Sequence, residues 1–267
     1  MSRVTRRALE SAARAAIPPA ALELLLRVVR PRRFFSGPIA CWPAGSTYGG
    51  DNRHIGLARS ERSTDQSTLA EQPLVTVRAV TALLAAIADA TTDGSICRIV
   101  DFGGGLEAPM YGIVRSLLPP SISLDWRVVE LADVVAAARP GPETSWVTHA
   151  DAPTDTDVVV TDAAIQYVEH PLELITWFGT LRPETIVVNR LPCTDSQPFI
   201  LEQRMPVRRS AHTFPMNVVS KIDLERTVLA MGYQISATWI GGPGYRIRYG
   251  ARASDVFGFV IARCDNR

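Results

Sequence analysis

The stretch from Cys97 to Gly105 constrains the fold of this chain more than any other. It is a short apolar run, typical of a buried strand, that leads directly into three consecutive glycines. Apolar residues at helical spacing follow over 110–118, until Pro119-Pro120 ends the pattern. A strand, a glycine turn and a helix in this order let a backbone approach a nucleotide-like ligand. Glycine also serves a tight turn for conformational reasons alone, so both interpretations stay open.

A second short apolar run ends in a carboxylate. Residues 126–129 read Trp-Arg-Val-Val, and Glu130 follows 25 positions after Gly105. In doubly wound folds an acidic residue at the end of the second strand accepts hydrogen bonds from ribose hydroxyls, whereas it would repel a phosphate. This spacing predicts a nucleoside-binding site, and the alternative is a solvated strand end.

The composition indicates an ordinary globular protein. The chain has 267 residues, of which 46% are hydrophobic and 21% charged, and this length can bury one main domain with an appendage. Its net charge of +1 gives no overall field that would attract nucleic acid. The four cysteines are far apart in the sequence and form no metal-ligand pattern. We therefore expect a reduced, cytoplasmic protein without a metal site, a disulfide framework or a membrane span.

The first 72 residues differ from the rest. Residues 1–33 carry eight arginines and are broken by Pro18-Pro19, which predicts two short basic amphipathic helices. These helices can rest on an anionic membrane surface or pack on the protein's own core, and both alternatives stay open. Residues 34–72 are irregular but contain aromatics and glycines, which favours a functional loop or lid. We therefore divide the chain into an N-terminal helical and lid segment, 1–72, and a main domain, 73–267.

Strand and helix patterns alternate in the main domain. Apolar runs over 157–161 and 185–189 predict buried strands, and a capping box at Ser220 predicts a helix. We interpret residues 193–219 as an irregular segment. The last two strand patterns, 234–240 and 256–262, have no helix between them. The expected fold is α/β, with helices on the faces of a mostly parallel sheet that has an antiparallel edge formed by this terminal strand pair, and the C-terminal strand is antiparallel.

Together these motifs resemble the class I S-adenosylmethionine-dependent methyltransferases, whose Rossmann-like sheet has seven strands. The resemblance covers roughly residues 73–262 through the strand order, the glycine turn, Glu130 and the run 157–162. A narrower resemblance is to a bacterial family of methyltransferases found with surface-polysaccharide biosynthesis genes. It rests on Trp42 and four short motifs, which are Phe35-Ser36-Gly37-Pro38, Tyr48-Gly49, Ala164-Ile165-Gln166-Tyr167 and Asn189-Arg190-Leu191-Pro192.

The resemblance implies a role for each matching residue. Glu130 would hold the ribose hydroxyls of S-adenosylmethionine, and Asp151 would face its adenine amino group. Asp162, at the end of the fourth strand, would also lie beside the cofactor. The residues that would border the methionine and ribose parts are Asp101, Gly103, Gly104 and Gly105. The sequence departs from the family pattern at Glu107-Ala108, where relatives tend to carry another glycine. A carboxylate near the cofactor's sulfonium is electrostatically tolerable, and the alternative is a remodelled site or weakened binding.

Methyl transfer to a hydroxyl needs a base that removes the proton. Residues near the carboxyl ends of the fourth and fifth strands, and in the segment that follows, are suited by position. They are Asp162, Tyr167, His170, Asn189, Arg190 and His212. We predict His212, beside Arg208 and Arg209, because its ordinary pKa suits general-base catalysis near neutrality. Asp162 and Tyr167 are the other catalytic candidates, and a surface histidine without a role is the alternative.

Three functions are compatible with these residues. We expect an enzyme that methylates a hydroxyl of a bacterial glycan or of a glycan precursor. The first alternative is a methyltransferase of another small metabolite. The second is a catalytically inactive binding protein that keeps the fold, and Glu107 is the feature that points to it. The sequence leaves the acceptor and the oligomeric state open.

Overall fold

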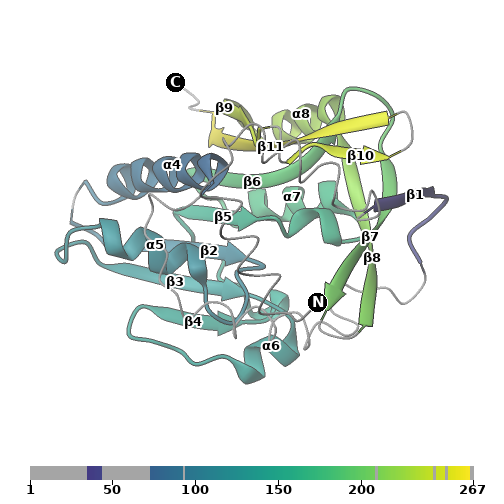
Figure 1. Cartoon of the computed structure of the whole chain (residues 1–267). Coiled ribbons are helices and arrows are strands. Elements are labelled where there is room, and N and C mark those ends of the chain that lie inside the picture. Colours follow the sequence, from purple (N-terminus) through teal and green to yellow (C-terminus); the bar gives the residue numbers. More distant parts are fainter. Residues whose placement is uncertain are drawn as a thin grey trace, which may run out of the picture.

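The computed structural model describes residues 35–43, 73–92, 94–207, 210–242, 245–249 and 252–264. Helices cover both faces of a central sheet (Figure 1). Within these residues the strands of the central sheet are β2 (Cys97–Phe102), β3 (Leu124–Val129), β4 (Thr144–Val147), β5 (Val158–Asp162), β6 (Thr185–Thr194), β9 (Tyr233–Ile240) and β11 (Arg252–Arg263). The α-helices are α4 (Leu74–Ala90), α5 (Pro109–Leu117), α6 (Ala132–Ala137), α7 (Pro171–Thr180) and α8 (Lys221–Ala230). None of these described helices is long and apolar enough to cross a membrane.

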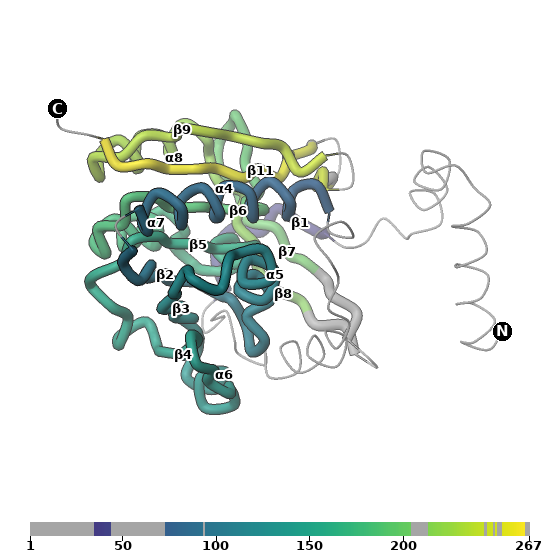
Figure 2. The backbone as a smooth tube through the Cα atoms, turned by 90° about the vertical axis from the view of Figure 1, so that its left-hand side faces the viewer, coloured from purple at the N-terminus to yellow at the C-terminus, as the bar shows by residue number. Residues whose placement is uncertain are grey.

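The strand order of the central sheet is β4-β3-β2-β5-β6-β11-β9. Figure 2 shows these strands from β9 and β11 at the top to β4 at the bottom. Parallel pairing joins β4 through β6, whereas β11 runs antiparallel to both of its neighbours. The described strands therefore confirm the predicted Rossmann-like, mostly parallel sheet of seven strands with an antiparallel C-terminal strand. The expected antiparallel edge is formed by the terminal pair of β11 and β9, in which β11 lies next to β6 and β9 is the outermost strand.

Side chains of the parallel strands alternate between two hydrophobic cores. In β5, Val158 and Val160 face the core under α4 and α5, and Val159 faces the core under α7 and α8. A strand that is covered on both faces needs apolar residues at successive positions, which explains why this run is continuous. Helix α8 begins as predicted, because the hydroxyl of Ser220 accepts a hydrogen bond from the Asp223 amide.

Further strands continue the sheet from the end of β6. β7 (Phe199–Val207) and β8 (Ser210–Ser220) form an antiparallel hairpin. β8 pairs with the end of β6, and β1 (Phe35–Ile39) pairs with β7. The short strand β10 (Ile247–Tyr249) pairs with β11, and its Ile247 packs with Leu201 of β7 in a third, small core. Figure 1 shows the hairpin on the side of the sheet toward which the parallel strands point.

Two of the expected irregular regions are therefore corrected. Residues 193–194 complete β6, and most of 195–219 belongs to the hairpin. Residues 35–39 form β1, although residues 44–72 of the expected lid and the expected basic helices lie outside the described residues. Pro206 and Pro215 interrupt the apolar alternation of the hairpin, which hides it from sequence periodicity. β1 is equally hidden, because Ser36 pairs with Glu202, 166 residues later.

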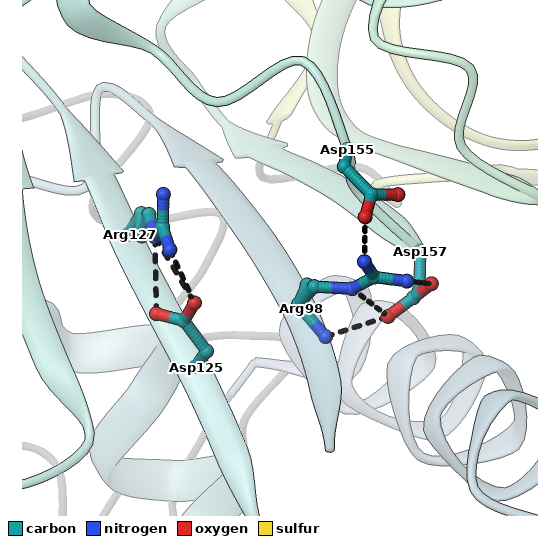
Figure 3. A network of polar contacts seen from close by, with 5 residues as sticks. All are labelled: Arg98, Asp125, Arg127, Asp155 and Asp157. Atoms are coloured by element: carbon teal, nitrogen blue, oxygen red, sulfur yellow. Dashed lines mark hydrogen bonds and ion pairs between the residues drawn. The ribbon is translucent and has the colours of Figure 1, made fainter. Parts of the chain in front are cut away.

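An ionic network joins the amino ends of two central strands (Figure 3). The backbone amide, Nε and Nη2 of Arg98 donate to the carboxylate of Asp157 at 2.8, 3.1 and 2.9 Å, and Nη1 pairs with Asp155. On β3, Asp125 and Arg127 form a second pair, with Nη2 at 2.7 Å from Oδ2. These groups lie at the edge opposite to the carboxyl ends, where ligands bind in open α/β sheets. The contacts of Arg98 with Asp157 join β2 to the start of β5, whereas the Asp125–Arg127 pair lies within β3.

A bulge in β6 distinguishes the carboxyl end of the sheet. Leu191 pairs with Phe257 and Val188 pairs with Phe259, so Asn189 and Arg190 together face the single residue Gly258. The indole of Trp239 lies across this glycine, where an added Cβ would be 2.0 Å from the ring. Gly258 therefore allows Trp239 to reach the bulge.

This contact predicts that Gly258→Ala destabilises the protein. The new methyl group must displace the Trp239 ring, and overpacking of this kind costs about 1–3 kcal/mol. Gly112→Ala is the matched control, because a Cβ there meets nothing within 4 Å inside helix α5, and the change should stabilise by about 0.5–1 kcal/mol. Urea unfolding measures both, and equal stabilities of the two variants would refute the packing argument.

Candidate functional site

The glycine turn after β2 is required by close packing at two of its three positions. An added Cβ at Gly103, whose φ is +73°, would lie 2.3 Å from the Cβ of Ala164. At Gly104 it would lie 2.5 Å from Oδ2 of Asp101. Gly105 is different, because its φ is +71° but a Cβ would meet nothing within 4 Å. The turn therefore needs glycine for its own structure, and it also leaves open space beside Gly105.

Glu130 holds this turn from the neighbouring strand. Its Oε1 accepts the amide of Gly105 at 3.0 Å, and its Oε2 accepts the amide of Leu131 at 3.1 Å. Trp146 Nε1 donates to the Gly105 carbonyl at 2.8 Å, so the turn is fixed from both sides. Burial raises the pKa of the half-buried Glu130, and the two amide hydrogen bonds oppose that effect. Each carboxylate oxygen keeps a lone pair that can accept from a ligand hydroxyl.

Asp101 is a buried carboxyl group at the end of β2. It is 2% exposed, and Trp126 Nε1 donates to its Oδ2 at 3.1 Å. Burial raises the pKa of Asp101 to about 7, the Trp126 hydrogen bond lowers it, and the charges of Asp162 and Glu130 raise it. The ends of β2, β3 and β5 thus each carry a carboxyl group, and the charges of Glu130 and Asp162 act on Asp101. Carboxylate oxygens with free lone pairs can accept from ligand hydroxyl groups.

Asp162 is engaged by a chain of polar side chains. Its Oδ1 accepts from Asn189 Nδ2 at 3.0 Å and from Arg190 Nε at 2.5 Å, and its Oδ2 accepts from Arg190 Nη2 at 2.5 Å. Asn189 is 1% exposed, and its Oδ1 accepts from Trp239 Nε1 at 3.2 Å. Sequence reasoning listed Asn189 and Arg190 only as bases and missed Trp239, because only the bulge opposite Gly258 places that indole here.

Two residues beside these polar side chains have a left-handed backbone conformation. Ala163 and Arg190 have φ values of +57° and +59°, and they follow directly on the paired strand residues Asp162 and Asn189. Left-handed conformations of residues other than glycine are costly and persist where the surroundings fix them. Ala108, at φ +39°, precedes α5 in the same conformation. The resemblance expected a glycine near this position, and the positive φ gives the physical reason.

The remaining predicted site residues have different surroundings in the structure. The hydroxyl of Tyr167 donates to Gln203 Oε1 on β7 at 2.6 Å, which ties the turn after β5 to the hairpin. The backbone of His212 pairs with Met205 near the hairpin tip, and its side chain lies outside the described residues, as do Arg208 and Arg209.

Two other predicted residues are exposed. Asp151 is one of them, and Thr148 Oγ1 donates to its carboxylate at 2.5 Å. His170 is exposed and precedes the first residue of α7, without a side-chain capping hydrogen bond, as expected for a helix-start residue.

Two further polar atoms lie in this region, one on Gln166 of the Ala164–Tyr167 motif and one on Thr161, and no role was expected for either from the sequence. Gln166 Oε1 and Thr161 Oγ1 are buried, and among the described residues neither has a hydrogen-bond partner. Both flank Asp162 along the chain, in β5 and in the 3-10 turn η3 (Ile165–Tyr167). Buried polar atoms normally have partners, so this region has unmet hydrogen-bonding capacity that a ligand or water can fill.

The raised pKa of Asp101 predicts a pH-dependent stability. The unfolded carboxyl group titrates near 3.9 and the folded one near 7, so between these values folding retains a proton that the unfolded chain releases. The free energy of unfolding should therefore fall as the pH rises from 5 to 8, by about 2–3 kcal/mol from this group. Asp101→Asn should remove that slope, and the exposed Asp89→Asn should keep it. Parallel slopes for wild type and Asp101→Asn in urea unfolding would contradict the assignment.

No protein-family model and no curated protein sequence matches this chain. Its fold is similar to those of solved structures. The 1,6-didemethyltoxoflavin-N1-methyltransferase of Burkholderia thailandensis aligns with a TM-score of 0.49 at 10% identity, over 86% of this chain and 95% of that one. A sugar N-methyltransferase of a Streptoalloteichus species gives 0.49 at 13% identity, over 79% and 93% of the two chains. A magnesium protoporphyrin IX methyltransferase of Synechocystis gives 0.44 at 10% identity, over 95% and 96%. At these identities the likeness is one of fold.

Proposed function

We propose that this chain binds S-adenosylmethionine across the carboxyl ends of β2 and β3 and transfers its methyl group to an acceptor. The contact between Glu130 and the Gly105 amide carries the proposal, because it places a half-buried carboxylate against a turn with open space beside it. Ribose hydroxyl groups can donate to the free lone pairs of Glu130. A dinucleotide would instead bring a pyrophosphate toward the carboxylates, which repel it.

The charges of the site support a cationic ligand. Asp101, Glu130 and Asp162 lie close enough for the last two to raise the pKa of the first. A positive sulfonium or ammonium group would lower the cost of the buried negative charge. When bound, S-adenosylmethionine supplies an electrophilic methyl group for in-line displacement. The chain's own part is to orient the two reactants and to exclude water.

We infer that the acceptor is a hydroxyl group of a bacterial glycan or glycan precursor, and that the reaction occurs in the cytoplasm. The inference is based on the motifs shared with the polysaccharide-associated family. The Phe35–Pro38 motif lies in β1 on the hairpin, and Tyr167 of a second motif bonds to the same hairpin. Arg190 of a third motif lies near Tyr167, close enough for the deprotonated phenol to raise the pKa of Arg190. The proximity of motifs that are distant in sequence supports the proposal that they serve one acceptor site.

Two of the three candidate bases, Asp162 and Tyr167, differ in the hydrogen bonds that their side chains already make. Asp162 is poorly suited, because Asn189 and Arg190 already occupy its oxygens. The hydroxyl of Tyr167 donates a hydrogen bond to Gln203, which favours a positioning role for this residue. His212 stays a prediction. A small-metabolite methyltransferase and an inactive binding protein are the alternatives, and a tritium-transfer assay from labelled S-adenosylmethionine to a glycan panel separates binding without turnover from catalysis.

Glu130→Ala should weaken the binding of S-adenosylmethionine by about 1.5–3 kcal/mol, or roughly 10- to 150-fold in Kd, because hydrogen bonds to a charged acceptor are lost. Isothermal titration calorimetry measures this loss. The same loss should appear with 5′-methylthioadenosine, which keeps the ribose, but not with adenine. Glu225→Ala, an exposed change on α8, is the control. Unchanged affinity in a folded Glu130→Ala protein would remove Glu130 from the site.

A further inference from the structure

We propose that Arg190 anchors an anionic group of the acceptor, a carboxylate or a phosphate, and that Asp162 holds the guanidinium in the orientation this requires. The acceptor assignment rests on the proposed function. Anion binding by Arg190 does not, because it depends only on the residues at the ends of β5 and β6.

The hydrogen bonds of Arg190 are only partly satisfied by protein. A guanidinium carries five N–H donors, and Asp162 accepts from Nε and from Nη2. Among the described residues no other acceptor bonds to it, which leaves both donors of Nη1 and the second donor of Nη2. The side chain is 29% exposed, so part of it can be reached from solvent. A planar pair of N–H donors matches a carboxylate or a phosphate bidentately.

The guanidinium is also held rigidly. Arg190 sits in the β6 bulge at φ +59°, and its partner Asp162 is fixed by Asn189. Asn189 is fixed in turn by Trp239, which lies over Gly258. Burial lowers the pKa of Arg190, but the charge and hydrogen bonds of Asp162 raise it by more, so the group stays cationic. A preorganised cation loses little entropy when an anion binds.

Its position suits the acceptor better than the cofactor. Asp162 and Asn189 are paired residues of β5 and β6, whereas Glu130 and the glycine turn belong to β3 and β2. Tyr167 and Tyr245 lie near Arg190, and Tyr167 connects to the hairpin that extends the sheet on this side. An anion beside Asp101 and Glu130 would be repelled, while the edge of Arg190 that faces away from Asp162 offers unpaired donors.

Inorganic phosphate is the probe, and its binding is measured by saturable thermal stabilisation at constant ionic strength. Wild-type protein should respond in the millimolar range, and Arg190→Gln should lose the response. The double variant Asp162→Asn/Arg190→Gln should lose it too, without leaving an unpaired carboxylate. Asp162→Asn alone should still bind phosphate, because the amide oxygen can continue to accept from the guanidinium while the competing negative charge is removed. Arg226→Gln, at an exposed ion pair on α8, should behave as wild type.

Two results would overturn the proposal. One is an equal phosphate response in all variants. The other is displacement of phosphate by S-adenosylhomocysteine, which would assign Arg190 to the cofactor's own carboxylate; we expect phosphate to bind in its presence. If S-adenosylhomocysteine fails to bind at all, the proposed function fails, yet the phosphate titration still decides whether Arg190 is an anion site.

Discussion

The burial of one carboxyl group, that of Asp101, is the constraint on which the ligand edge of the sheet depends. Burial is the main reason why its pKa rises to about 7, and the nearby Asp162 and Glu130 add to the effect. Trp126 must donate to it, and residue 104 must be glycine, because a Cβ would lie 2.5 Å from its oxygen. A cationic ligand offsets this crowding of negative charge, whereas a phosphate increases it. The chemistry of the edge therefore follows from a group that the fold keeps out of water.

The polar groups at the amino ends and at the carboxyl ends of the parallel strands differ in how far their hydrogen bonds are satisfied. At the amino ends, Arg98 and Asp157 satisfy each other and join β2 to β5. At the carboxyl ends, hydrogen bonds hold the polar groups in place, but some of their donors and lone pairs stay unpaired among the described residues. Glu130 keeps lone pairs beside the open space at Gly105, and Arg190 keeps unpaired donors beside Asp162. Fixed groups with remaining hydrogen-bonding capacity are what a binding site needs.

Much of the central fold could be predicted from sequence, because continuous apolar runs of β-branched residues such as Val158–Val160 are typical of strands covered on both faces. The contact of Glu130 with Gly105 was also predictable, since adjacent parallel strands bring both to one edge. The hairpin β7–β8 was not, because prolines and a partly exposed surface obscure its period. The Arg190–Asp162 pair was not either, because it depends on strand register and on a bulge opposite Gly258. Local patterns encode burial, whereas these contacts are set by tertiary pairing.

The most direct test is whether a nucleoside ligand contacts the glycine turn. In protein labelled with 15N-glycine, the 18 glycines give few enough amide signals to assign and follow by NMR. Titration with S-adenosylhomocysteine should shift the signals of Gly103, Gly104 and Gly105. Gly94 and Gly232, which precede β2 and β9 at the amino ends of these strands, should not move. Unmoved signals of all three turn glycines at about 1 mM ligand, where even weak specific binding would register, would contradict the proposed site.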